Sequence, residues 1–317
     1  MSIGNAHLET SFDIDRKEIT ETFHRDEPCP VLIPWKCHGR LQPTFFFLFS
    51  RRRMMKTPVL TIAGSDPSGG AGIQADLKSL SANGVYAMSV LTSITAQNTC
   101  GVSSVFHLPL DIIQAQLDAI FSDIPVTTIK TGMLATTEII TVVSNKLATQ
   151  NIEYLVVDPV MVAKGGHVLL EEDAISTLKG KLFPQASLIT PNIYEAQVLS
   201  GMTIQTIADV RAAAKIIHQL GCRHVLIKGG HLDEQPGTDL LYDGRFFRMY
   251  KGEYIQTQNT HGTGCTFASA IAAHLAKGKP IADAIEAAKS YITEAIRHSF
   301  TLGKGHGPTD HFYFLQA

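Results

Sequence analysis

The stretch Val59-Leu60-Thr61-Ile62-Ala63-Gly64-Ser65-Asp66-Pro67-Ser68-Gly69-Gly70-Ala71-Gly72 joins a short apolar run to a loop of glycine, serine and proline. The residues from Gly72 to Ser81 then carry apolar side chains at three- and four-residue spacing, which is the pattern of an amphipathic helix. A buried strand that leads through a loop into a helix is the repeating unit of α/β proteins. Because the chain repeats this unit, we expect a mostly parallel central sheet with helices on both faces.

Apolar runs and helical patterns alternate along most of the chain. We predict strands at Val59–Ala63, Ala87–Ile94, Thr128–Thr131, Tyr154–Asp158, Ser187–Thr190 and His224–Lys228. We predict helices at Gly72–Ser81, Leu110–Phe121, Thr137–Thr149, Asn192–Ser200, Ile207–Leu220, Gly262–Ala276 and Ile281–Ser299. Short alternating strands follow at Leu240–Tyr242, Arg245–Tyr250 and Tyr254–Gln256, with hairpin turns at Asp243-Gly244 and Lys251-Gly252. They predict a short β-hairpin addition to the sheet.

Residues 1–54 differ from the rest of the chain. They show no sustained hydrophobic period, and the apolar run Phe45–Phe49 precedes the basic run Arg51–Arg53. A secretory signal places its basic residues before the apolar stretch, and a transit peptide is poor in acidic residues. Residues 1–54 therefore match neither kind of targeting sequence. We therefore predict a poorly structured leader or a mis-started extension over 1–54, and one α/β domain over 55–317.

The composition argues against several classes of protein. With 44% hydrophobic and 18% charged residues, the chain has the makeup of a globular protein with an ample core. A formal net charge of −2 gives no electrostatic footprint for nucleic acid, and no apolar run approaches the length that spans a bilayer. The cysteines are odd in number, scattered and without metal-ligand spacing: Cys29, Cys37, Cys100, Cys222 and Cys265. We expect a cytoplasmic protein that acts on small molecules and binds neither nucleic acid nor membrane.

Polar residues and glycines follow the predicted strands, at the edge where an open parallel sheet binds ligands. These segments are Gly64–Gly72, Thr95–Thr99, Lys130–Met133, Asp158–Met161, Thr190–Asn192 with Glu195, and Lys228–Gly230. Hydrogen-bond donors and carboxylates therefore recur from strand to strand, which favours a binding site. The sequence contains no Walker-type phosphate loop, so nucleotide chemistry would need another arrangement.

Each of these segments also has a plainer explanation. The glycines of Gly69–Gly72 can form an ordinary turn. Asn192 can be the N-cap of its helix, with Glu195 completing a capping box. Lys130 and Lys228 can be solvated strand ends. The sequence of any one segment leaves both interpretations open.

The segment Asn259–Ala270, NTHGTGCTFASA, places a small-residue loop directly before a predicted helix. Glycine lets the backbone approach a ligand closely, and the first turn of a helix has unpaired amides that bind anions. The hydroxyls of Thr260, Thr263 and Thr266 can cap the helix or bind phosphate oxygens. Cys265 lies at the start of this helix, where the helix dipole lowers a thiol pKa. In the plainer alternative the glycines only turn the chain and Cys265 is a packing residue.

Four segments together resemble those of hydroxymethylpyrimidine/phosphomethylpyrimidine kinases: Thr61–Asp76, Ala96–Thr99, Lys228–His231 and Asn259–Cys265. The resemblance extends from Met55 to the end of the chain and implies a ribokinase-like fold. It also implies a kinase that uses MgATP to phosphorylate the hydroxymethyl group of 4-amino-5-hydroxymethyl-2-methylpyrimidine. The same site would then phosphorylate the monophosphate to the diphosphate used for thiamine synthesis. The family resemblance further suggests a homodimer.

Matched motif by motif, the resemblance implies that Gly64, Asp76 and Gln97 line the pyrimidine pocket. Met133 and Val160 would form its apolar walls. An aminopyrimidine offers a donor and an acceptor side by side, and the carboxamide of Gln97 can satisfy both. A glutamine at this position therefore favours a pyrimidine over pyridoxal.

On the nucleotide side, the resemblance implies that Asp158 and Glu195 organise Mg²⁺ through water, in keeping with the partial hydration that this ion prefers. It assigns ATP binding to Lys228, Asn192, Thr260 and Thr263. It assigns catalysis to Gly262, Thr263, Gly264 and Cys265.

Cys265 occupies the position at which most ribokinase relatives carry an aspartate that takes the proton of the attacking hydroxyl; the branch of the family that this chain resembles has cysteine there. We hypothesise that Cys265 orients or deprotonates that hydroxyl. The amides of Gly262 to Cys265 would stabilise charge on the transferred phosphoryl group, since phosphoryl transfer depends mainly on alignment and neutralisation.

Three other functions remain open at this point. Pyridoxal kinase activity is the nearest, because related enzymes accept both rings. A thiol hydrolase would use Cys265 as nucleophile and His261 as base. A regulator that binds the pyrimidine without catalysis would consume no ATP.

Overall fold

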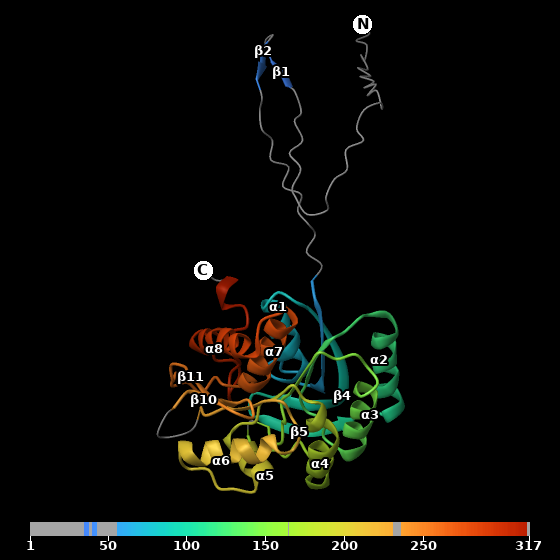
Figure 1. Ribbon diagram of the computed structural model, residues 1–317, viewed down its shortest axis with the longest axis vertical. Coiled ribbons are helices and arrows are strands. Elements are labelled where there is room, and N and C mark those ends of the chain that lie inside the picture. Colours follow the sequence, from blue (N-terminus) through green and yellow to red (C-terminus); the bar gives the residue numbers. More distant parts are fainter. Residues whose placement is uncertain (1–34, 38–39, 43–55, 164, 231–235, 316–317) are drawn as a thin grey trace. The chain divides into compact units, whose positions relative to one another are not determined.

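The computed structural model describes residues 35–37, 40–42, 56–163, 165–230 and 236–315 (Figure 1). The chain divides into two units, Met1–Met55 and Lys56–Ala317. In the first unit, β1 (Trp35–Cys37) and β2 (Arg40–Gln42) pair antiparallel. The predicted leader lies mostly outside the described residues and stays a prediction.

The second unit is built on a sheet whose described strands follow the order β11-β10-β9-β8-β7-β6-β3-β4-β5. Their bounds are β3 (Pro58–Ser65), β4 (Tyr86–Asn98), β5 (Gly101–His107), β6 (Thr128–Thr131), β7 (Tyr154–Val157), β8 (Leu188–Ile189), β9 (Val225–Ile227), β10 (Thr238–Tyr242) and β11 (Phe247–Lys251). The strands from β9 to β4 run parallel, whereas β5 at one edge and β10 and β11 at the other pair antiparallel. The mostly parallel sheet and the hairpin addition are confirmed.

The parallel strands are buried on both faces, so successive side chains enter opposite cores. In β3, Leu60 and Ile62 belong to one hydrophobic cluster and Val59 belongs to the other. Strands β7 and β9 alternate in the same way. This burial on both sides is why these strands read as continuous apolar runs in the sequence.

Helices cover both faces of the sheet, and each face has its own cluster of buried side chains (Figure 1). One face holds α1 (Gly72–Ala82), α7 (Thr263–Ala276) and α8 (Ile281–Arg297). The other holds α2 (Leu110–Asp123), α3 (Thr137–Leu147), α4 (Glu172–Thr177), α5 (Ile193–Ser200) and α6 (Ile207–His218). No helix among the described residues is both long and apolar enough to cross a membrane.

Helix α7 lies in the middle of its face, between α1 and α8 and against β3, β6 and β7. Every residue from Thr266 to Leu275 is buried, and alanine is frequent among them because the sheet and both neighbouring helices approach closely. The hydroxyl of Ser79 on α1 donates to the main-chain oxygen of Thr266 at 2.8 Å. This packing fixes the N-terminus of α7 at the carboxyl ends of the parallel strands.

A fully buried ion pair joins α1, the sheet and α7. Lys130 Nζ on β6 lies 2.9 Å from both carboxylate oxygens of Asp76 on α1. Thr61 donates to this carboxylate at 2.6 Å and Ser269 at 2.8 Å. Burial lowers the pKa of Lys130, but the negative charges of Asp76 and its neighbours outweigh burial and raise it above its ordinary value. The buried charges of Lys130 and Asp76 therefore both have partners.

Three differences between the sequence-based elements and the structure concern strands and α-helices of the second unit. Strand β5 (Gly101–His107) is not predicted, because its side chains are exposed or half-buried and it is joined to β4 by main-chain pairing and by polar contacts such as that of Ser93 with His107. The six-residue helix α4 is not predicted either. Tyr254–Gln256 is not a strand, and Lys251-Gly252 makes no hairpin: Gly252 donates to the oxygen of Gly237, and the chain then runs along a cavity that Tyr254 and Ile255 line.

We expect Lys130→Met to lower the free energy of unfolding by about 3–5 kcal/mol, because Asp76 would remain as an uncompensated buried charge. The double variant Lys130→Met, Asp76→Asn removes both charges of this pair and is expected to regain much of this loss. Urea denaturation followed by circular dichroism measures both. The matched control is Lys146→Met, which breaks an exposed pair with Asp118 and costs less than about 1 kcal/mol. An equal loss in the free energy of unfolding for Lys130→Met and Lys146→Met would contradict the idea that burial determines the effect of losing the lysine.

Candidate active site

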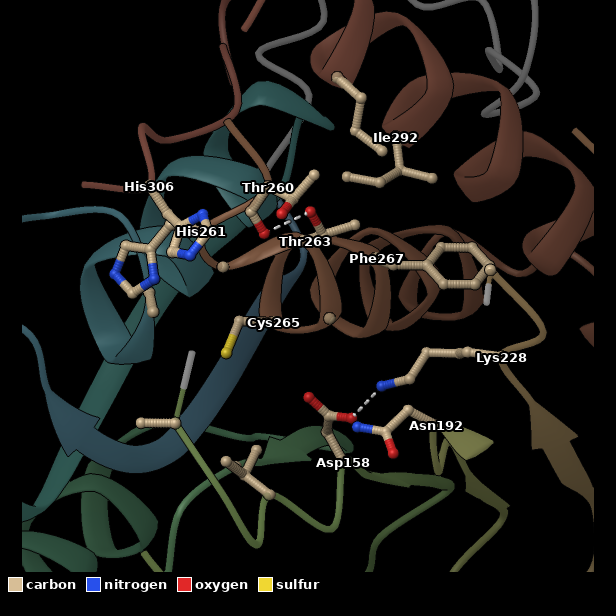
Figure 2. A pocket seen from close by; sticks show the side chains of 18 of the residues that line it. Asp158, Asn192, Lys228, Thr260, His261, Thr263, Cys265, Phe267, Ile292 and His306 are labelled. Atoms are coloured by element: carbon tan, nitrogen blue, oxygen red, sulfur yellow. Dashed lines mark hydrogen bonds and ion pairs between the residues drawn. The ribbon is translucent and has the colours of Figure 1, made fainter. Parts of the chain in front are cut away.

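The carboxyl ends of the parallel strands surround a cavity of about 540 Å³. Figure 2 shows Cys265 at the start of α7, with Asp158, Asn192 and Lys228 on the facing strand ends. This is the edge at which an open α/β sheet binds ligands. Of the segments that carry the family resemblance, His231 alone lies outside the described residues.

The first turn of α7 presents main-chain amides to the cavity. Gly262 has a φ of 73°, and a Cβ atom there would collide with the carbonyl oxygen of Gly70, so this position requires glycine. The helix begins at Thr263, whose hydroxyl donates to the main-chain oxygen of Thr260 at 2.8 Å (Figure 2). The next amides, including that of Gly264, have no acceptor within the helix, and unpaired amides of this kind are suited to bind an anion.

Lys228 and Asp158 form an ion pair in the cavity, with 2.7 Å between Nζ and Oδ1 (Figure 2). Thr190 donates to the same carboxylate at 3.0 Å. Burial raises the pKa of Asp158, but the ammonium groups of Lys228 and Lys130 outweigh burial and hold it below its ordinary value. Gly264 lies against this pair, because a Cβ atom there would be 3.2 Å from Lys228 Nζ. The lysine is therefore adjacent to the unpaired amides at the start of α7.

Asn192 and Glu195 form the capping box of α5. Asn192 Oδ1 accepts from the amide of Glu195, and Glu195 Oε2 accepts from the amide of Asn192, both at 2.8 Å. The plainer interpretation of this pair is confirmed, yet both side chains also line the cavity. Burial raises the pKa of Glu195 to about 7, with Lys228 opposing the rise and Asp158 adding to it. A carboxylate has more acceptor sites than the cap uses, so Glu195 can also serve a ligand.

Cys265 lines the cavity but is not an activated thiol. Burial raises its pKa to about 11; Lys130 opposes this rise, while the carboxylates Asp76 and Asp158 add to it. The expected lowering of this pKa by the helix dipole is therefore wrong. A helix end contributes roughly 1–2 kcal/mol at most, which burial here exceeds. At neutral pH Cys265 is a protonated thiol.

Asp76 does not line the cavity, contrary to the expectation from the resemblance. Its carboxylate is fully buried and is held by Lys130, Thr61 and Ser269. Asp76 therefore has no contact to offer a pyrimidine ring. It acts through the packing of α1 and α7 behind the site.

The remaining residues assigned to the pyrimidine pocket, Gly64, Gln97, Met133 and Val160, all line the cavity. Met133 packs directly on Gly64, where a Cβ atom would lie 3.0 Å from the methionine sulfur. Gln97 Oε1 lies 3.2 Å from the hydroxyl of Thr95. Together these side chains form an apolar wall that carries a single carboxamide.

Two buried neighbours of Gln97 are absent from the predicted site residues. His261 Nε2 lies 2.8 Å from Asp66 Oδ2 and 3.3 Å from Gln97 Nε2. Asp66 follows β3, and His261 immediately precedes Gly262; both line the cavity. They belong to segments that carry the resemblance. Their separation of 195 residues hides the pairing from any analysis of local spacing.

The end of the cavity near α8 also contains residues that the sequence gives no reason to group. Lys289 on α8 and Asp239 on β10 form an ion pair at 2.7 Å, and both line the cavity. Phe267 and Ile292 lie at the same end (Figure 2), and Lys289 Nζ lies 5.9 Å from the centre of the Phe267 ring. Apolar side chains beside a charged pair suit a flat polar heterocycle.

Comparison with known proteins agrees with this architecture. The family model described as phosphomethylpyrimidine kinase matches residues 66–310. A thiamine biosynthesis bifunctional protein from Geobacter sulfurreducens is 53% identical over 83% of the chain, which spans 54% of that relative's length. A hydroxymethylpyrimidine/phosphomethylpyrimidine kinase from Bacillus subtilis is 46% identical over 80% of the chain and 94% of its own length.

Solved structures show the same fold. The ADP complex of a pyridoxal kinase from Bacillus subtilis is 44% identical with a TM-score of 0.77, covering 83% of this chain and all of that one. A phosphomethylpyrimidine kinase from Clostridium difficile is 48% identical with a TM-score of 0.69, covering 76% of this chain and all of that one. The chain therefore belongs to the phosphomethylpyrimidine kinase family and has a ribokinase-like fold.

Proposed function

We propose that this protein transfers the γ-phosphoryl group of ATP to 4-amino-5-hydroxymethyl-2-methylpyrimidine, and then to the resulting monophosphate, for thiamine biosynthesis. The main support is one cavity that holds an anion-binding helix end, a lysine, and a carboxamide on an apolar wall. The names of the relatives agree with this activity. Both substrates of the transfer would then meet at the N-terminus of α7.

The wall formed by Gly64, Gln97, Met133 and Val160 suits a small aromatic ring. Gln97 would pair with the 4-amino group and the adjacent ring nitrogen, because a carboxamide offers one donor and one acceptor along the same edge. Met133 and Val160 would cover the ring faces. The hydroxymethyl group would then lie toward the first turn of α7.

The phosphates of ATP would lie on the amides of Gly262 to Cys265 and beside Lys228. Phosphoryl transfer requires alignment and charge neutralisation more than covalent chemistry, and these groups supply both. The hydroxyl of Thr260 is at the same turn and can donate to phosphate oxygens, whereas the hydroxyl of Thr263 would first have to leave the main-chain oxygen of Thr260. The apolar end at Phe267 and Ile292 would accept the adenine ring.

Mg²⁺ fits this site as a hydrated ion. In the described part of the chain, no group of three or more metal-ligating side chains comes together. Mg²⁺ does not need one, since it keeps several waters and uses one or two carboxylates with phosphate oxygens. Asp158 supplies one carboxylate next to Lys228, and Glu195, with its pKa raised to about 7, supplies a second when it is ionised. The ion would neutralise charge on the phosphates of ATP.

We assign Cys265 the role of orienting the attacking hydroxyl. We do not assign it the role of a base that takes the proton of this hydroxyl. A protonated thiol is a weak hydrogen-bond partner and cannot take the hydroxyl proton at neutral pH. A loose transition state places little demand on a base, so orientation with late loss of the proton is sufficient.

The geometry of the cavity gives less support to a thiol hydrolase or a pyridoxal kinase. A thiol hydrolase needs a thiolate and a histidine base, but the Cys265 thiol has a raised pKa and the Nε2 of His261 is bound to Asp66. Pyridoxal is the competing substrate because pyridoxal kinases share the fold, and Gln97 argues against it as the main substrate. The homodimer and the cytoplasmic location stay predictions.

We expect purified protein with labelled ATP and the pyrimidine to yield the monophosphate and then the diphosphate. Lys228→Met is expected to lower kcat by about 100-fold or more, because it removes a positive charge beside the transferred group. Lys146→Met, which changes a half-buried lysine that does not line the cavity, serves as the control. Ligand binding without ATP consumption would indicate a regulator, and faster turnover of pyridoxal would indicate the other kinase.

The raised pKa of Cys265 predicts its alkylation profile. The rate of reaction with iodoacetamide is expected to rise about tenfold per pH unit from pH 7 and to level off only near pH 11, because only the thiolate reacts. Mass spectrometry of the Cys265 peptide measures this rate, and the exposed Cys100 in the same digest is the reference. A plateau near pH 7 would mean that the thiol is activated after all.

Cys265→Ala tests the orienting role separately. We expect kcat to fall by roughly 10- to 100-fold, because a misplaced hydroxyl loses alignment with the phosphoryl group. The KM for ATP and the unfolding midpoint are expected to stay close to those of the wild type. Near-normal turnover in a folded Cys265→Ala variant would remove Cys265 from the mechanism.

A further inference from the structure

The ion pair of Lys289 and Asp239 lies next to Lys228, the lysine to which we assign phosphate binding. Lys289 Nζ on α8 lies 2.7 Å from Asp239 Oδ2 on β10. Both side chains line the cavity, with 15% of the lysine side chain and 4% of the aspartate side chain exposed. Asp239 Oδ1 also accepts from the amide of Gly229 at 3.1 Å. The pair thus joins α8 to the residue that follows Lys228.

The register of β9 and β10 brings Asp239 and Lys228 together. Leu240 pairs with Ile227 in the antiparallel ladder of these two strands. One residue further along both chains, the same register sets Asp239 opposite Lys228, and opposite residues of an antiparallel pair share a face of the sheet. Burial raises the pKa of Asp239 overall, while the ammonium groups of Lys289 and then Lys228 oppose the rise. Asp239 is therefore close enough to Lys228 to interact with its charge.

Each of the two carboxylates beside Lys228 has its own lysine. Lys228 Nζ bonds to Asp158 Oδ1 at 2.7 Å, whereas Lys289 bonds to Asp239 (Figure 2 shows the first pair). The first pair lies against the start of α7, since a Cβ atom on Gly264 would be 3.2 Å from Lys228 Nζ and 3.6 Å from Asp158 Oδ2. If Lys228 turned to Asp239 instead, its ammonium would leave this position.

We propose that Lys289 is a positioning residue: by pairing with Asp239, it keeps this carboxylate from drawing Lys228 away from the start of α7. This inference rests on the proposed function, which places the phosphates of ATP at that turn. A buried carboxylate without a cation is strongly unfavourable. When Lys289 is lost, Asp239 therefore attracts Lys228, and the phosphates lose the positive charge that faces them.

Two competing explanations give Lys289 a different role. In the first, Lys289 itself binds a phosphate of ATP. In the second, it only packs α8 in place: a Cβ atom on Gly252 would lie 2.5 Å from Lys289 Cε, and Lys289 Nζ lies 5.9 Å from the centre of the Phe267 ring. In both cases a second change at Asp239 would restore nothing, because the missing contact is made by the lysine alone.

The test measures the affinity for MgATP by calorimetry and kcat/KM for ATP. We expect Lys289→Met to lower both by about tenfold or more, because Asp239 then competes for Lys228. The double variant Lys289→Met, Asp239→Asn is expected to return to within about threefold of the wild type, since asparagine is uncharged and still accepts from Gly229. Arg248→Met breaks an exposed pair with Glu286 of α8 and is the matched control, with both values unchanged.

A Lys228→Met background isolates the route through Lys228. There, Lys289→Met is expected to change the affinity for MgATP by less than about twofold, because no lysine remains to be drawn away. An equal loss with and without Lys228 overturns the proposal, as does a loss that Asp239→Asn fails to restore. Thermal unfolding establishes that each variant is folded.

An unchanged affinity in folded Lys289→Met also overturns the proposal, and would mean that Asp239 takes up a proton instead of attracting Lys228. Failure of the proposed function has a different signature. If the wild type binds MgATP but phosphorylates no pyrimidine, the proposed substrate is wrong, and the calorimetric affinities still decide the role of Lys289.

Discussion

The burial of α7 against the sheet is the constraint on which the rest of the site depends. A helix surrounded by the sheet and by α1 and α8 cannot shift, so its unpaired N-terminal amides stay at the carboxyl ends of the strands. The Lys130–Asp76 pair reinforces this position, because Ser269 of α7 donates to the same carboxylate. The position of these amides thus follows from packing directly beneath the cavity, where Lys130 Nζ lies against Gly132.

The sequence predicts the elements that burial determines. Strands buried on both faces give apolar runs, and Thr128–Thr131 is predicted with its observed bounds because no solvent-facing position interrupts it. Gly101–His107 escapes prediction, since main-chain pairing with β4 leaves no pattern in its side chains. Tyr254–Gln256 alternates like a strand but lines a cavity instead. The spacing of apolar residues indicates which face of a segment is buried. It does not indicate whether a neighbouring strand, a helix or a ligand cavity lies against that face.

The site residues divide in the same way. Residues at strand ends and in the glycine turn reach the cavity as predicted, because the topology alone places them there. The burial of Asp76 and the raised pKa of Cys265 depend on charges and atoms brought together by the fold. The sequence predicts a helix whose dipole lowers the pKa of a thiol at its start. It does not show the desolvation by the surrounding fold, which raises this pKa. The larger of two opposing effects was therefore the one that local sequence cannot show.

One turn of the backbone connects the two ends of the cavity. His261 lies beside the Gln97 amide, and the next residue, Gly262, is the N-cap of α7. Gly262 is pressed against Gly70, so the turn cannot move without the loop that holds Asp66. Under the proposed function, ring recognition and phosphate binding would be set by adjacent residues on a single support. The distance between the ring and the transferred phosphoryl group would then depend on this turn.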